Sequence, residues 1–292
     1  EVNSETDFVG KNEKFQGFVL DVAKTIVEKN PADVEDLLGV NLVGTDRTVQ
    51  ENLQDLILSI GENMKIRRFE RAEGTICTYI HAGGSVGVMV RLDTDDATAA
   101  KPELAEMGKN VAMQIAAMSP EYLAKEDISA DELAKMKTII IESSLNKPDT
   151  LPKPILTSVV EKTIAAGAWD DATKATYEEQ KNNKFLFNFL SDEAVAALAA
   201  TAVANKEEYV ANPIFSKASE GRINKQLKEI CLLEQEFVRG DLFEGSVKGY
   251  VDSVAKKLGA DVKVIGFTRY VKGEGIEKKE ENFAAEIASM VK

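Results

Sequence analysis

The chain has 292 residues, of which 44% are hydrophobic and 29% are charged, and its formal net charge is −13. This length and composition fit one large or two to three smaller globular domains and exclude a disordered chain. The acidic balance argues against nucleic-acid binding, because affinity for phosphates comes largely from clustered lysine and arginine. No segment approaches the roughly 18 apolar residues of a membrane span, and none resembles a secretory signal. The two cysteines, Cys77 and Cys231, are too few for a disulfide framework or a metal cluster and are expected as buried thiols.

Two helices are predicted in the N-terminal part of the chain. Apolar residues recur at helical spacing over residues 12–29, and this pattern ends at Asn30. A second helix follows Thr48, which has the spacing of a capping box with Glu51. Gly61 is expected to end this helix, since glycine readily adopts the left-handed conformation found there.

The period then changes from helix to strand. Residues 64–71, 75–81 and 86–92 are predicted as strands, the last of them with alternating apolar residues. Gly83 and Gly84 form a hairpin signal between the second and third strands. Because the connections are short, the strands are expected to pair antiparallel.

Further helices are predicted after this sheet. An apolar stripe begins at Pro102, and Ser129 with Glu132 forms another capping-box pattern. Prolines roughly bracket residues 147–217, a compositionally distinct segment that we interpret as a largely helical insertion. A final amphipathic helix is ended by Gly259 and followed by a strand.

An internal repeat relates the first and last helix–strand pairs. Identical residues recur at identical spacing after each helix: Gly61, Lys65, Phe69 and Arg71 match Gly259, Lys263, Phe267 and Arg269. This repeat favours two related α+β units over chance similarity. It also leads us to predict a strand at residues 230–233, where the pattern alone fits strand or helix.

Signatures of enzymes are mostly absent. The loop Gly39–Gly44 lacks the lysine that a phosphate-binding loop requires, and Gly273-Glu274-Gly275 is a lone turn. His81 is the single histidine, so a structural or interface role is favoured over a catalytic one. We therefore predict no catalytic residue, no metal ligand and no cofactor.

Asp7 and Phe8 precede the first long helix and have two interpretations. In the first interpretation, Asp7 is an acid at the N-terminus of the helix and Phe8 is a hydrophobic staple that packs on it. In the second, the apolar ring of Phe8 and the adjacent charge of Asp7 together form a wedge for a partner's pocket. Gln114 lies on an otherwise apolar helix face, which indicates either a packed interface or a tolerated edge position.

Several motifs together resemble the bacterial elongation factor Ts family. They are Thr6-Asp7-Phe8-Val9, residues 60–63 with 66–68, the glycine-rich hairpin at 79–88, residues 220–222 with 228–238, and residues 273–278 with 283–286. The resemblance implies an α+β fold with two related core subdomains, each with a small antiparallel sheet flanked by helices, and a coiled-coil-type helical insertion. It places core subdomain N at residues 1–107 and core subdomain C at 108–146 and 218–292. The enlarged insertion, a coiled-coil or dimerisation region, is placed at 147–217.

The resemblance also implies a function and a set of contacts. A member of this family is a cytoplasmic guanine-nucleotide exchange factor that performs no covalent chemistry. It binds elongation factor Tu in the GDP-bound and nucleotide-free states and promotes GDP release by dislodging Mg²⁺. The residues expected at the partner are Thr6, Asp7, Phe8 and Val9, followed by His81, Val86, Gly87, Val88 and Gln114. Neither nucleic acid nor membrane is expected as a partner, and a homodimer is left open.

The sequence departs from the family pattern at several positions. Ala82 stands where the family usually has glycine, Ser85 where it usually has arginine, and Gln114 where some members have histidine. The family's N-terminal helical module is absent, so we expect a truncated or processed chain. Two alternatives are a chaperone-like interaction protein with the same fold, and a small-molecule enzyme acting around His81, which the missing acid–base cluster disfavours.

Overall fold

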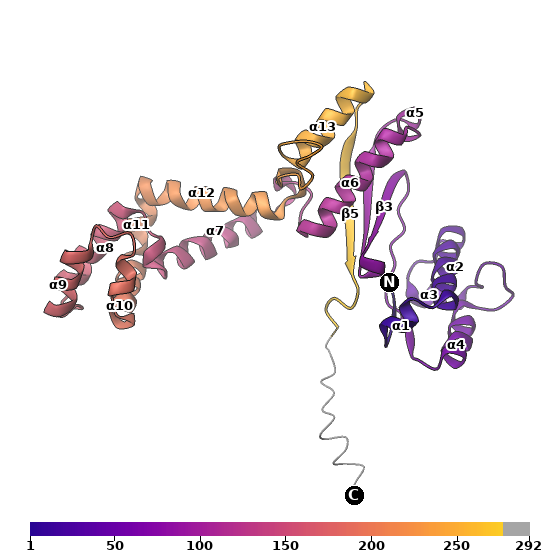
Figure 1. Cartoon of the computed structure of the whole chain (residues 1–292), viewed down its shortest axis with the longest axis horizontal. Coiled ribbons are helices and arrows are strands. Elements are labelled where there is room, and N and C mark those ends of the chain that lie inside the picture. The colour runs from indigo at the N-terminus through magenta and orange to yellow at the C-terminus, as the bar shows by residue number, and fades with distance from the viewer. Residues whose placement is uncertain (277–292) are drawn as a thin grey trace, which may run out of the picture. The chain divides into compact units, whose positions relative to one another are not determined.

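A computed structural model of the chain describes residues 1–276, and its internal contacts divide the chain into two units (Figure 1). Unit 1 comprises Glu1–Ser119 and continues from Gly249, and unit 2 comprises Pro120–Lys248. The motif at 283–286 and the end of the predicted subdomain C lie outside the described residues. A division by contacts does not decide which segments fold independently, so the predicted domain boundaries stay predictions.

Unit 1 combines helices with two small antiparallel sheets, which confirms the α+β class. Its elements are β1 (Val2–Ser4), α1 (Asp7–Gly10), α2 (Glu13–Lys29), α3 (Val34–Gly39), α4 (Val49–Ile60), β2 (Met64–Ile66), β3 (Thr75–His81), a 3-10 turn (Ala82–Gly84), β4 (Val86–Asp93), α5 (Asp96–Ala99), α6 (Pro102–Met118), α13 (Val247–Leu258) and β5 (Lys263–Val271). Strand β1 pairs with β2, and the second sheet has the order β3-β4-β5.

The capping box at Thr48 and the two glycines predicted to end helices are confirmed. The Asn12 side chain caps α2, and Thr48 and Glu51 form a complete capping box at α4. Gly61 and Gly259 both adopt positive φ directly after a helix, at 83° and 66°. The helix–glycine–strand part of the repeat is therefore present twice.

Among the described residues of unit 1, apolar side chains are buried both in the N-terminal part and against the three-stranded sheet. In the N-terminal part, α2, α3 and α4 bury a common cluster that includes Phe18, Leu37 and Leu53. In the second part, α6 packs on one face of the three-stranded sheet (Figure 1). Alternate residues of β4 face this helix and are buried, as a half-buried strand requires: Val88, Val90 and Leu92.

The first predicted strand is shorter than expected. Residues 64–71 were predicted as one strand, but β2 ends at Ile66, where its pairing with Val2 of β1 ends. Beyond that point the Arg67 and Arg68 side chains bind the Glu1 carboxylate, and no further strand pairing is present there among the described residues. Phe69 and Arg71 therefore lie outside a strand, whereas their repeat partners lie within β5.

Unit 2 is helical, which confirms the helical character predicted for residues 147–217. Its elements are a 3-10 turn (Lys125–Asp127), α7 (Ala130–Leu145), a 3-10 turn (Pro148–Thr150), α8 (Lys153–Ala165), α9 (Asp171–Gln180), a 3-10 turn (Leu186–Phe189), α10 (Asp192–Ala204), α11 (Lys206–Ala211), α12 (Pro213–Ile230) and a 3-10 turn (Leu232–Glu234). Helices α7 and α12 lie side by side, and α8 to α11 gather at one end of this pair (Figure 1).

The strand predicted at residues 230–233 is wrong. Helix α12 continues to Ile230, because the Cys231 N–H still donates to the Leu227 carbonyl. A 3-10 turn follows, and only an isolated bridge joins Cys231 to Tyr122. Cys231 is fully buried as expected, whereas Cys77 is half-buried, and burial raises the pKa of both thiols.

Candidate functional site

Helix α1, which carries Asp7 and Phe8, is a single turn anchored from outside. The Thr6 hydroxyl does not cap this helix, because it donates to a Glu62 carboxylate oxygen at 2.7 Å. The Thr6 backbone N–H donates to the other oxygen of the same carboxylate at 3.1 Å. Val9 is only 4% exposed and belongs to the core of α2 and α4. The turn is therefore fixed on both sides of Phe8.

Phe8 itself is 87% exposed, the largest exposure among the large hydrophobic residues described. A hydrophobic staple would be packed against the following helix, so this interpretation of Phe8 does not fit the structure. The ring is held away from the core by a turn whose neighbours are anchored.

The hairpin tip, residues His81–Ser85, joins β3 to β4. His81 is exposed, and its Nδ1 lies 2.9 Å from the Tyr79 hydroxyl. Ala82 adopts φ +47°, a left-handed conformation that glycine adopts at much lower cost. The alanine at position 82, where the family usually has glycine, thus lies at a position whose backbone conformation favours glycine.

The other predicted partner residues differ in their accessibility. Val86 and Gly87 are half-buried at the start of β4. Val88 is 3% exposed and faces α6, and Gln114 is fully buried on α6, so Gln114 is not at a solvent-exposed edge. Both side chains are buried in this structure, and their assignment to the partner contact stays a prediction.

Lys272, directly after β5, joins α1 to the hairpin tip. Its ammonium lies 2.9 Å from Asp7 Oδ1, and its backbone N–H donates to the Ser85 carbonyl at 2.9 Å. The hydrogen bond and the positive charge of Lys272 lower the pKa of the Asp7 carboxyl from its ordinary value. The predicted wedge and the predicted hairpin contact are thus adjoining parts of one surface, which we call the wedge surface (Asp7, Phe8, residues 81–85 and Lys272).

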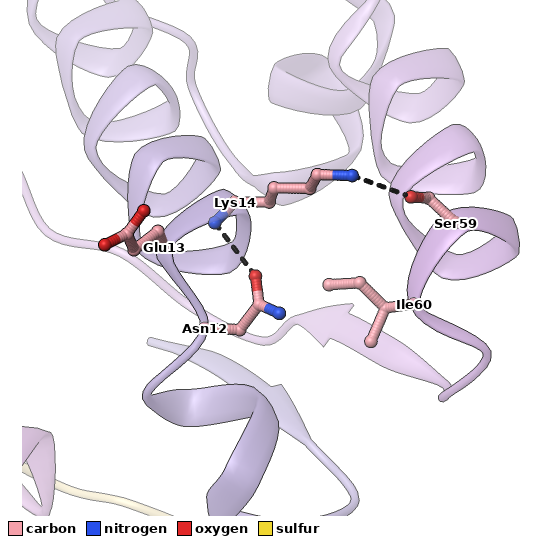
Figure 2. Close-up of a pocket in the computed structure, with 5 residues that line it drawn as sticks. All are labelled: Asn12, Glu13, Lys14, Ser59 and Ile60. Carbon is pink, nitrogen blue, oxygen red and sulfur yellow. Dashed lines mark hydrogen bonds between the residues drawn. The ribbon is translucent and has the colours of Figure 1, made fainter.

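An open cleft of about 470 Å³ lies close to α1, between the start of α2 and the end of α4. Its lining residues bind one another: Asn12 accepts from the Lys14 N–H at 2.9 Å, and Lys14 reaches across to Ser59 at 3.4 Å (Figure 2). These contacts satisfy the helix terminus and link the two helices behind the turn. The polar groups of the cleft are therefore used in capping α2 and in linking it to α4.

Within residues 1–276 no group of three or more His, Cys, Asp or Glu side chains is arranged to hold a metal ion. No helix in the same range is both long and apolar enough to cross a membrane.

Comparison with known proteins identifies the family. The sequence profile of the family described as Elongation factor TS matches residues 5–274. Proteins named elongation factor Ts from Trichlorobacter lovleyi and Clostridium perfringens are each 36% identical over 99% of this chain, covering 74% and 75% of their own lengths. One from Magnetococcus marinus is 33% identical over 100% of the chain and 75% of its own length. The chain therefore belongs to the elongation factor Ts family, a family of translation elongation factors.

Two residues of the site were missed in the sequence. Glu62 belongs to a motif that resembles the family, but no role followed from its position. Lys272 lies 265 residues from Asp7 along the chain, so no local pattern could connect them. A lysine directly after a strand and before a glycine is too common to be a signal.

Proposed function

We propose that the chain binds elongation factor Tu and promotes the release of GDP from it, without covalent chemistry of its own. The observation that carries this proposal is the 87% exposure of Phe8 on an anchored turn, beside a carboxylate and next to the hairpin tip. Phe8 enters a pocket of the GTPase domain, Asp7 goes with it, and the hairpin braces the same domain.

The energetics of such a wedge are favourable. Burying an exposed phenylalanine side chain contributes about 1.5–3 kcal/mol. The partner holds GDP through backbone contacts to the phosphates and a bound Mg²⁺, and displacing the ion removes much of that grip. The wedge must bind the nucleotide-free state better than the GDP-bound state, and each tenfold loss of GDP affinity needs about 1.4 kcal/mol of differential contact.

The test is GDP release from elongation factor Tu loaded with fluorescent GDP, with this chain present at substoichiometric concentration. We expect the chain to accelerate release with multiple turnover. Raising free Mg²⁺ should slow the stimulated rate, since the ion and the wedge compete for the same state. Binding without any acceleration would contradict the proposal and support the alternative, a non-catalytic or chaperone-like interaction protein.

A further inference from the structure

Lys272 has a role that the proposed contacts do not include. Its side chain holds Asp7 of α1, while its backbone extends the pairing of β5 onto the hairpin tip through the Ser85 carbonyl. The next residue, Gly273, donates its N–H to the Glu1 carboxylate at 3.1 Å, and that carboxylate also binds Arg67. The backbone of Lys272 is therefore fixed on both sides, and its ammonium is held at a defined place.

Helix α1 needs such a contact because it cannot fix its own orientation. It has four residues, and one turn of helix is unstable by itself. Thr6 and Val9 tie it to the N-terminal core through Glu62 and through burial. That core also contacts the end of β5, from Glu1 to Gly273 and from Arg68 to the Val271 carbonyl, but these contacts do not involve α1 itself. The ion pair between Asp7 and Lys272 supplies a link from α1 to the three-stranded sheet.

We propose that Lys272 is a positioning residue for nucleotide exchange: it holds Asp7, and with it Phe8, at a fixed place beside the hairpin tip. This inference rests on the proposed function. The wedge surface is then already ordered before the partner binds. Less conformational entropy is lost on binding, because α1 and the hairpin tip do not have to be ordered separately. Both side chains are well exposed, at 54% for Lys272 and 84% for Asp7, so the effect is modest. Loss of an exposed ion pair is expected to change kcat/KM for GDP release by about two- to fivefold.

A double-mutant cycle tests the inference, with kcat/KM for stimulated GDP release as the first readout. We expect Lys272→Met to lower kcat/KM by about two- to fivefold and Lys272→Arg to restore it, because arginine keeps the charge. In an Asp7→Asn background, Lys272→Met should have no further effect. The difference between wild type and Lys272→Met should shrink at high salt, where an exposed pair is screened. Lys29→Met is the control, since it removes an equal charge from the exposed end of α2.

A second readout separates positioning from folding. The Asp7 carboxyl pKa, followed by NMR, should rise in Lys272→Met, while the melting temperature stays within about one degree of wild type, as for a surface substitution. Equal exchange rates for wild type and Lys272→Met would overturn the inference and leave the proposed function standing. An undiminished effect of Lys272→Met in the Asp7→Asn background would show direct contact with the partner and also overturn positioning. If the wild-type chain itself fails to accelerate release, the proposed function falls, and the inference falls with it.

Discussion

Phe8 combines high exposure with anchored neighbours, and this combination separates its role in binding from any role in folding. We predict that Phe8→Ala lowers kcat/KM for GDP release by about tenfold or more. The reason is that the ring is no longer buried in the partner, which removes up to about 3 kcal/mol of binding free energy. Its melting temperature should hardly change, since 87% of the side chain already contacts solvent.

The matched control for this prediction is Leu58→Ala. Leu58 is 82% exposed on α4, outside the wedge surface, so its removal deletes a similar apolar side chain without touching the proposed site. Both variants should melt like wild type, and only Phe8→Ala should slow exchange. A large fall in melting temperature with exchange intact would return Phe8 to a structural role.

Glu1 gives unit 1 a specific dependence on pH. Its side chain is 7% exposed, and burial alone would raise its pKa. Hydrogen bonds from the Gly273 N–H, Asn3, Arg67 and Arg68 outweigh burial and lower the pKa from 4.5 to about 2. A carboxylate with a lowered pKa in the folded state stabilises the fold above its unfolded pKa. We therefore predict up to about 3 kcal/mol of stability that is present above pH 4.5 and lost as the pH falls towards 2.

The measurement compares wild type with Glu1→Gln by urea unfolding, followed through NMR signals of β4 and β5. The difference in unfolding free energy between the two proteins should shrink steadily between pH 4.5 and 2, because the glutamine does not titrate. The other carboxylates titrate equally in both proteins, so their contribution to the pH dependence cancels in this difference. A difference that stays constant over this range would mean that the Glu1 carboxylate gains nothing from its partners.

At the scale of elements, the packing of α6 on β3 depends on the absence of a side chain at Gly108. A Cβ at this position would lie 2.1 Å from Cys77 Sγ and 2.6 Å from Cys77 Cβ. We predict that Gly108→Ala destabilises unit 1 by about 1–3 kcal/mol through overpacking, although alanine is the better helix former. Thermal unfolding, followed through the same sheet signals, measures this loss.

Gly17→Ala is the matched control, because a Cβ at Gly17 in α2 would meet no atom within 4 Å. This variant should be stabilised by about 0.5–1 kcal/mol, since alanine reduces the entropy lost on forming the helix. Equal stabilisation of both variants would show that α6 can move away from β3 without loss.

The elements that the sequence predicted well are those encoded by neighbouring residues. Thr48 and Glu51 are three residues apart, so their capping box could be recognised directly. A strand, by contrast, ends where its partner ends, and the end of β2 at Ile66 depends on its pairing with Val2. The same limit applies to the candidate site. The sequence left Phe8 open between a packed staple and an exposed wedge, and only the folded chain decides its exposure and its coupling to Lys272.

At the scale of the whole molecule, the proposed site lies entirely within unit 1, and residues 147–217 form most of a separate core in unit 2. The ends of this segment are close together, because Arg222 of α12 donates to Ser144 of α7 and to the Thr150 carbonyl. A flexible linker of about eight Gly/Ser residues spans roughly 15 Å and can replace it. We predict that this variant folds and stimulates GDP release within about twofold of the full chain, because the wedge surface is unchanged.

Circular dichroism and the GDP-release assay on the same preparation test this prediction, with the full chain at equal concentration as the reference.

The replacement exposes Leu145, which is fully buried in the full chain, so about 1.5–3 kcal/mol of stability should be lost from the α7–α12 pair. Leu145→Ser in the same variant limits aggregation through the exposed position. Lost exchange with an intact β3-β4-β5 sheet would mean that the partner also contacts the insertion. An insoluble chain would mean that the insertion completes a core on which the remaining units depend, and that the predicted boundaries at 146 and 217 are wrong.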